Sequence, residues 1–150
     1  MSSDAPETIE IRRGAGALVY RRDPRLTCVA GERDVATGAS RWSLPEEGLV
    51  VVEAVGREGR PVYRLGDGPL PFVPTGRLHV RLPHGRRLEE AAFDLSELGL
   101  RVVKVQDWAP HTGFVEDARG DLVAPLWLVD RVRLRIGAEL VEPEMLTVRR

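Results

Sequence analysis

The stretch RLHVRLPHGRRLEEAAFDLSELGLRVVKV, residues 77–105, predicts a strand, a helix and a second strand in immediate succession. In its first part, Leu78, Val80 and Leu82 alternate with basic or polar residues. Such alternation is typical of a strand with one buried face, because successive side chains point to opposite sides. Residues 83–85, Pro-His-Gly, then favour a turn.

The middle of this stretch predicts an amphipathic helix. Apolar side chains recur at intervals of three and four residues from Leu88 to Leu98, and acidic residues occupy the other side. Gly99 follows, where a left-handed residue commonly ends a helix. Residues 101–105 are expected to form the next strand, followed by a loop that contains Trp108.

The remaining C-terminal residues predict a strand, a second helix and a final strand. Residues 113–116 and 138–142 are the expected strands, and residues 122–132 the expected helix, with Pro125 in its first turn. Residues 131–136 alternate with period two, so we expect this helix to be short and to lead early into an extended segment. The order β-α-β-β-α-β predicts an α+β, ferredoxin-like unit.

The first half of the chain predicts a small antiparallel β subdomain. The expected strands are residues 8–13, 17–20, 26–30, 49–55 and 61–65. A turn at Asp23–Pro24 is expected to separate the second strand from the third, and residues 56–60 to connect the last two as a hairpin.

The domain organisation follows from one linker. Residues 66–76 hold three prolines and three glycines, a composition that disfavours both helix and sheet interior. We therefore expect a disordered leader at residues 1–7, a mostly-β subdomain at 8–65, the linker, and an α+β domain with an extended C-terminal tail at 77–150.

Composition and charge exclude several classes of partner. With 43% hydrophobic and 30% charged residues, the chain is globular rather than disordered. Its formal net charge of -1 gives no attraction to nucleic acid or to an anionic membrane. The N-terminus lacks the basic start and apolar run of a secretion signal, and no segment is long and apolar enough to span a bilayer. We therefore predict a cytoplasmic protein.

Residues with catalytic chemistry do not form a recognisable pattern. No serine lies in a Gly-x-Ser-x-Gly turn, and the three histidines lack a metal-ligand spacing. Cys28 is the only cysteine, which excludes an internal disulfide and any multi-cysteine metal site. We predict a non-enzymatic protein with no cofactor, no metal and no catalytic residue.

A series of short motifs resembles the propeptide that precedes the catalytic domain of many bacterial subtilisin-like serine proteases (subtilases). Residues 62–65 and then 72–76, which end in Pro-Thr-Gly, are similar to the short strand and linker of that region. The strand at 78–82, the helix ending in Leu-Gly-Leu at 98–100, and the Val-Glu-Pro segment at 141–146 follow in the same order. The resemblance extends over residues 60–146.

This resemblance implies a protein-binding function. Family propeptides lay a sheet face against two surface helices of the protease, where acidic side chains cap helix N-termini. Their C-terminal tail then pairs as an added strand in the substrate cleft. The resemblance places Arg150 in the product-like position. The partner-binding residues that it implies are Glu142, Glu144, Met145, Leu146, Thr147, Val148, Arg149 and Arg150.

Because no catalytic domain follows the propeptide-like region in these 150 residues, we expect the module to act in trans. It would then be an inhibitor or folding chaperone of a separate subtilisin-like protease. The alternative is a scaffold or assembly subunit that uses a ferredoxin-like domain to bind a protein other than a protease, since one fold serves many functions.

Overall fold

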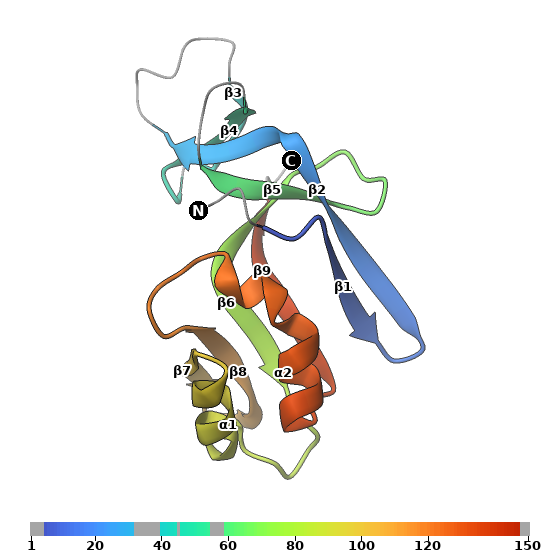
Figure 1. Cartoon of the computed structure of the whole chain (residues 1–150), viewed down its shortest axis with the longest axis vertical. Coiled ribbons are helices and arrows are strands. Elements are labelled where there is room, and N and C mark those ends of the chain that lie inside the picture. Colours follow the sequence, from blue (N-terminus) through green and yellow to red (C-terminus); the bar gives the residue numbers. More distant parts are fainter. Residues whose placement is uncertain (1–4, 32–39, 45, 55–58, 148–150) are drawn as a thin grey trace.

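A computed structural model of the chain describes residues 5–31, 40–44, 46–54 and 59–147. These residues form a mixed α/β structure, mostly antiparallel sheet with two short α-helices (Figure 1). The strands are β1 (Thr8–Arg13), β2 (Gly16–Ala30), β3 (Ser40–Leu44), β4 (Leu49–Glu53), β5 (Arg60–Leu65), β6 (Phe72–Arg81), β7 (Leu100–Gln106), β8 (Ala109–Asp117) and β9 (Leu140–Thr147). The helices are α1 (Ala92–Glu97) and α2 (Val129–Ile136), each preceded by a 3-10 turn, η2 (Leu88–Ala91) and η3 (Ala124–Trp127).

The described strands form one sheet in which every neighbouring pair is antiparallel. Its order is β3-β4-β2-β5-β6-β8-β7, with β1 paired to β2 and β9 paired to β6. The C-terminal strands therefore lie in the order β9-β6-β8-β7. Figure 1 shows α1 and α2 together in front of these four strands, so both helices cover the same face.

The predicted alternation in β6 is confirmed. Leu78, Val80 and Leu82 are fully buried and pack in the same cluster as Leu95 of α1 and Val132 of α2. This cluster is the larger of two hydrophobic cores in the described residues, and it lies between the helices and the sheet. The period of two in the strand and the spacing of three and four in the helices place these apolar side chains on facing surfaces.

The prediction of an extended segment at residues 131–136 is wrong. These residues complete α2, which ends at Gly137 with φ 67°, a left-handed conformation. Val132 and Ile136 are buried one helical turn apart, whereas Leu134 between them is 71% exposed. The side chains thus follow the helical period, and the apparent alternation had no structural counterpart.

The expected linker is shorter than predicted, because residues 72–76 form the first half of β6. Pro74 lies where the pairing of β6 with β9 is irregular, and Pro143 lies at the other end of that irregularity in β9. Proline lacks the N–H of a regular ladder, so an edge strand or a bulge is where a sheet accommodates it. The final strand accordingly continues past Pro143 to Thr147.

The N-terminal half also differs from its predicted strand order. Residues 17–20 and 26–30 belong to one bent strand, β2, whose pairing with β5 shifts between Arg22 and Thr27. Thus Asp23–Pro24 marks an irregularity rather than a turn. β2 lies between β4 and β5, so these two strands are not a hairpin. Residues 56–58 of the expected connection lie outside the described part of the chain.

Packing joins the two halves of the chain. Ile9 and Ile11 of β1 and Tyr63 of β5 belong to the same buried cluster as Leu78. The Tyr63 hydroxyl donates a 2.7 Å hydrogen bond to the carbonyl of Pro6, which is buried together with Ala5. The prediction of a disordered leader is therefore wrong for Ala5 and Pro6, whereas residues 1–4 lie outside the described residues. Within the described ranges, no helix has the length and apolar character needed to cross a membrane.

Candidate functional site

The sheet face opposite the helices, which we call the open face, is the candidate binding surface. Leu78 and Val80 point toward the helices, so their neighbours in β6 point the other way. The residues of the open face are Arg77, His79 and Arg81 of β6, Phe114 and Glu116 of β8, Arg101 and Lys104 of β7, and Glu142 of β9. This surface is continuous across four strands.

One row of the open face crosses the sheet from edge to edge. Glu142, His79, Phe114 and Lys104 are successive cross-strand partners in β9, β6, β8 and β7. The rings of His79 and Phe114 lie 5.2 Å apart at a tilt of 43°. Cross-strand pairs of this kind stabilise a sheet and also fix the exposed side chains in place. The row thus puts an aromatic pair at the centre of the face.

A second row is an ion-pair network around Glu116. Its carboxylate lies 2.7 Å from the Arg101 guanidinium on one side and 3.8 Å from Arg77 on the other. The side chain of Glu116 is 22% exposed, while those of Arg77 and Arg101 are 43% and 62% exposed. The arginines therefore present their charge to solvent, and the carboxylate is enclosed between them.

Glu142 is the second carboxylate of the open face, and it is also ion-paired within its own chain. It accepts a 2.6 Å hydrogen bond from Arg13, and the His79 Nδ1 atom lies 3.6 Å from its other oxygen. His79, followed by Arg13, holds the pKa of Glu142 below its usual value, in opposition to burial, which raises it. Glu142 thus stays ionised near neutral pH and is paired within its own chain.

The structure places the predicted C-terminal arm in the sheet. Met145, Leu146 and Thr147 pair with residues 72–74 of β6. Met145 packs against the larger core and Leu146 against the smaller one, and the Thr147 hydroxyl donates to the carbonyl of Pro71 at 3.0 Å. Glu144 accepts a 2.9 Å hydrogen bond from the Thr75 hydroxyl.

The expectation of a free arm is therefore wrong for residues 142–147, because their strand edge toward β6 is already used. Val148, Arg149 and Arg150 lie outside the described residues. Of the predicted binding residues that the structure describes, Glu142 pairs directly with a residue of the open face, His79.

Sequence reasoning did not single out Phe114 or His79 for binding. His79 lies between the apolar Leu78 and Val80, which identifies its outward side, whereas Phe114 lies beside the apolar Val115 and the sequence does not decide which of the two faces outward. Their meeting depends on the β6–β8 pairing, which joins residues 35 positions apart in the chain and has no local sequence signal. The missed feature is thus a consequence of topology.

The described residues offer little for nucleophilic or metal chemistry. Burial raises the pKa of Cys28 to about 11, so its thiol stays protonated and unreactive at neutral pH. No group of three or more His, Cys, Asp or Glu side chains within the described ranges is arranged to hold a metal ion. His84 and His111 stack with ring centroids 4.2 Å apart.

Comparisons of the chain with protein-family models, with curated proteins and with solved structures found no match. The resemblance to subtilase propeptides thus stays a prediction.

Proposed function

We propose that the chain is a non-enzymatic module that binds a subtilisin-like serine protease in trans, as inhibitor or folding chaperone, through its open face. The observation that carries this proposal is the sheet β9-β6-β8-β7, with both helices on one side. On its other side, cross-strand neighbours from all four strands form the open face. We further propose that this unit is ferredoxin-like. Antiparallel pairing of β6 with both β8 and β9, and of β8 with β7, supports that assignment.

The side chains of the open face have the composition of a protein interface. Phe114 and His79 provide an aromatic centre, and Arg77, Arg81 and Arg101 surround it with partly exposed guanidinium groups. Aromatic residues and arginine are enriched at interfaces, where a packed centre is enclosed by a polar rim. The face therefore suits a flat partner surface such as two neighbouring helices.

The charges of the open face do not favour the helix capping by acidic side chains that the resemblance to propeptides implies. Glu116 and Glu142 are paired with arginines of their own chain, so capping a partner's helix N-termini would require breaking those pairs. Arg77 and Arg101 are more exposed than the Glu116 carboxylate between them, whereas Arg81 is paired with the equally exposed Glu139. We propose that these arginines face acidic side chains of the protease, which makes association faster at low salt.

The position of β9 also limits how the module reaches the substrate cleft. Since residues 142–147 are bonded to β6 along one strand edge, they can pair in the cleft only through the opposite edge of β9, which pairs with no other described strand. In this arrangement the open face provides the main docking surface.

The test is a titration of the purified protein into the subtilisin-like protease encoded nearest to its gene. We expect a stable complex on size-exclusion chromatography, together with slower peptide hydrolysis or a higher yield of active protease on refolding. A chymotrypsin-type serine protease is the control, because it has the same catalytic triad on an unrelated fold. Unchanged proteolysis, unchanged refolding and no complex at a large excess would overturn the proposal and leave the scaffold alternative.

A further inference from the structure

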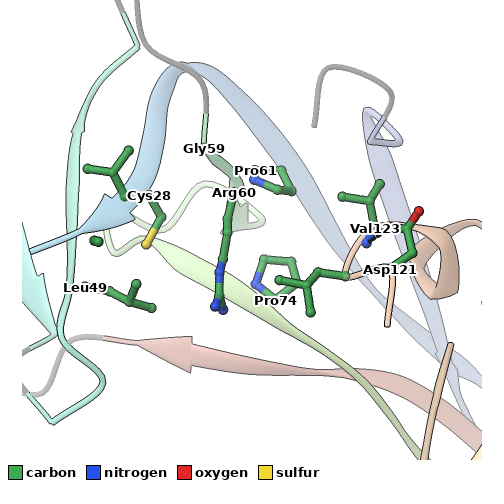
Figure 2. Close-up of a pocket in the computed structure, with 11 residues that line it drawn as sticks. Cys28, Leu49, Gly59, Arg60, Pro61, Pro74, Asp121 and Val123 are labelled. Atoms are coloured by element: carbon green, nitrogen blue, oxygen red, sulfur yellow. Dashed lines mark hydrogen bonds between the residues drawn. The ribbon is translucent and has the colours of Figure 1, made fainter. Parts of the chain in front are cut away.

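A cavity lies where the N-terminal strands meet the segment before η3, away from the open face (Figure 2). Its volume is about 660 Å³, which is within the range of small-molecule sites. β2, β4, β5, β6 and the loop at residues 121–123 all contribute to its wall. The lining residues are Cys28, Val29, Ala30, Leu49, Gly59, Arg60, Pro61, Pro74, Asp121, Leu122 and Val123.

Arg60 points into this cavity between Cys28 and Pro74 (Figure 2). Within the described ranges, its guanidinium has no hydrogen-bond or ion-pair partner. The nearby Arg64, by contrast, bonds both to Asp23 at 2.8 Å and to the carbonyl of Pro69. A partly buried guanidinium beside apolar walls is stabilised by an anion that restores the interactions lost with water. The cavity therefore holds a cation whose requirement for a counter-ion can be met by an anion from solution.

The other polar groups of the wall do not meet this requirement. Asp121 accepts hydrogen bonds from the backbone N–H groups of Val123 at 2.7 Å and Ala124 at 3.0 Å, and these bonds lower its pKa. Figure 2 shows its carboxyl group turned away from Arg60. The Cys28 thiol is neutral at physiological pH, because burial raises its pKa to about 11. Arg60 is thus the charge that a ligand would meet inside the cavity.

We propose that this cavity binds a small carboxylate that carries an apolar chain. The planar guanidinium of Arg60 matches a carboxylate with two parallel hydrogen bonds. Leu49, Pro74 and Leu122 provide apolar surface for the chain. This site is distinct in residues and position from the open face, so its test does not depend on protease binding.

The experiment is calorimetric titration of the full-length protein with octanoate. We expect saturable binding, with octanamide binding about tenfold more weakly, since the neutral amide lacks the charge-assisted bonds. Arg60→Gln should weaken octanoate binding about tenfold or more. Arg131→Gln, which removes an exposed arginine on α2, is the matched control and should leave affinity unchanged.

Amide chemical shifts locate the bound ligand. Octanoate should shift the amide signals of two segments, Val29–Ala30 and Leu122–Val123. These segments are far apart in the sequence, and both line the cavity. Ala30→Phe, which narrows the cavity, should reduce affinity. The proposal is overturned if octanoate gives no heat at millimolar concentration, if octanamide binds equally well to the wild type, or if the shifts lie elsewhere. The octanamide comparison needs no variant and so does not depend on variant folding.

Discussion

At the residue scale, Asp23 is a buried charged side chain of the N-terminal half, so the cost of its burial must be offset by hydrogen bonds. It is only 6% exposed and lies in the irregular part of β2. Its carboxylate accepts hydrogen bonds from the Arg64 side chain at 2.8 Å and from the Arg25 backbone N–H at 3.1 Å. A buried carboxylate is tolerated only when paired in this way. Asp23 therefore holds β2 and β5 together where their pairing is irregular.

Asp23→Asn should lower the free energy of unfolding by about 1–3 kcal/mol, because the charge-assisted bonds are lost and Arg64 is left without its carboxylate. Urea denaturation measures this change. Asp67→Asn is the control at an exposed turn position, and we expect it to change stability by less than about 0.5 kcal/mol. Equal effects of the two substitutions would contradict the structural role of Asp23.

Asp23 also gives stability a defined pH dependence. Burial raises the pKa of Asp23, but hydrogen bonds from Arg64 and Arg25 outweigh it and hold the pKa below the ordinary value of an aspartate. The unfolded chain therefore takes up this proton first as the pH falls. The stabilisation is complete above the unfolded pKa and is lost as the pH falls through the lower folded value.

We therefore expect the urea midpoint of the wild type to fall between pH 5 and pH 2 more steeply than that of Asp23→Asn. The two proteins should converge at the acid end, where the wild-type carboxyl is protonated. Parallel curves across this range, with the same offset at every pH, would show that the charge of Asp23 does not account for the difference.

The burial of a side chain could be predicted where its sequence neighbours alone decide which way it points. It could not be predicted where segments distant in the sequence form its surroundings. Leu78, Val80 and Leu82 were correctly assigned to the core, because the strand period alone decides which way they point. Arg60 and Phe114 were not singled out. Their partners in the cavity wall and in the open face come from segments that only the folded sheet brings together.

At the scale of elements, α2 shows how two periods compete. Val132, Leu134 and Ile136 alternate in sequence like a strand, but Val132 and Ile136 also fit one helical turn. The segment is helical because the helix places Val132 and Ile136 together in the core and leaves Leu134 exposed. The order of β4, β2 and β5 was equally hard to predict, since a short connection favours a hairpin unless another strand inserts.

The end of α1 provides an element-scale prediction. Gly99 has φ 80°, and a Cβ added there meets no atom within 4 Å, so a substitution costs only backbone strain. Gly99→Ala should destabilise the protein by about 1 kcal/mol. Gly16→Ala is the control, because Gly16 lacks a positive φ and also has room for a Cβ. Thermal unfolding should show a lower midpoint for Gly99→Ala alone, and similar midpoints for both would contradict the cap assignment.

At the scale of the whole molecule, the larger core includes residues from both halves of the chain. Ile11 of β1 is fully buried in the cluster that contains Leu78 and Val132. Ile11→Ala should therefore reduce the stability of the C-terminal unit as well, by about 2–4 kcal/mol. Val103→Ala, at a position 37% exposed on β7, should cost less than about 0.5 kcal/mol.

Denaturation of Ile11→Ala should be followed by the fluorescence of Trp127 in η3 and of Trp42 in β3, each isolated by replacing the other tryptophans with phenylalanine. We expect the two probes to report one coincident transition at lower urea. An unchanged midpoint for the Trp127 probe would show that the halves unfold independently.

In the proposed docking, Phe114 is the central apolar side chain of the open face. Phe93 offers a matched position, because it lies on α1, on the helical side of the sheet, and is 72% exposed. An aspartate at either position adds the same charge and removes the same ring. The two variants differ in which surface they change and also in burial, because Phe114 is partly buried against His79 and Phe93 is exposed; urea denaturation therefore establishes that both fold before their affinities are compared.

The most direct test of protease docking is the dissociation constant of the complex for the wild type, Phe114→Asp and Phe93→Asp, measured by titration against the subtilisin-like protease. We expect Phe114→Asp to weaken binding about tenfold or more and Phe93→Asp to stay within about threefold of the wild type. Binding that survives Phe114→Asp but is lost in Phe93→Asp would contradict docking through the open face.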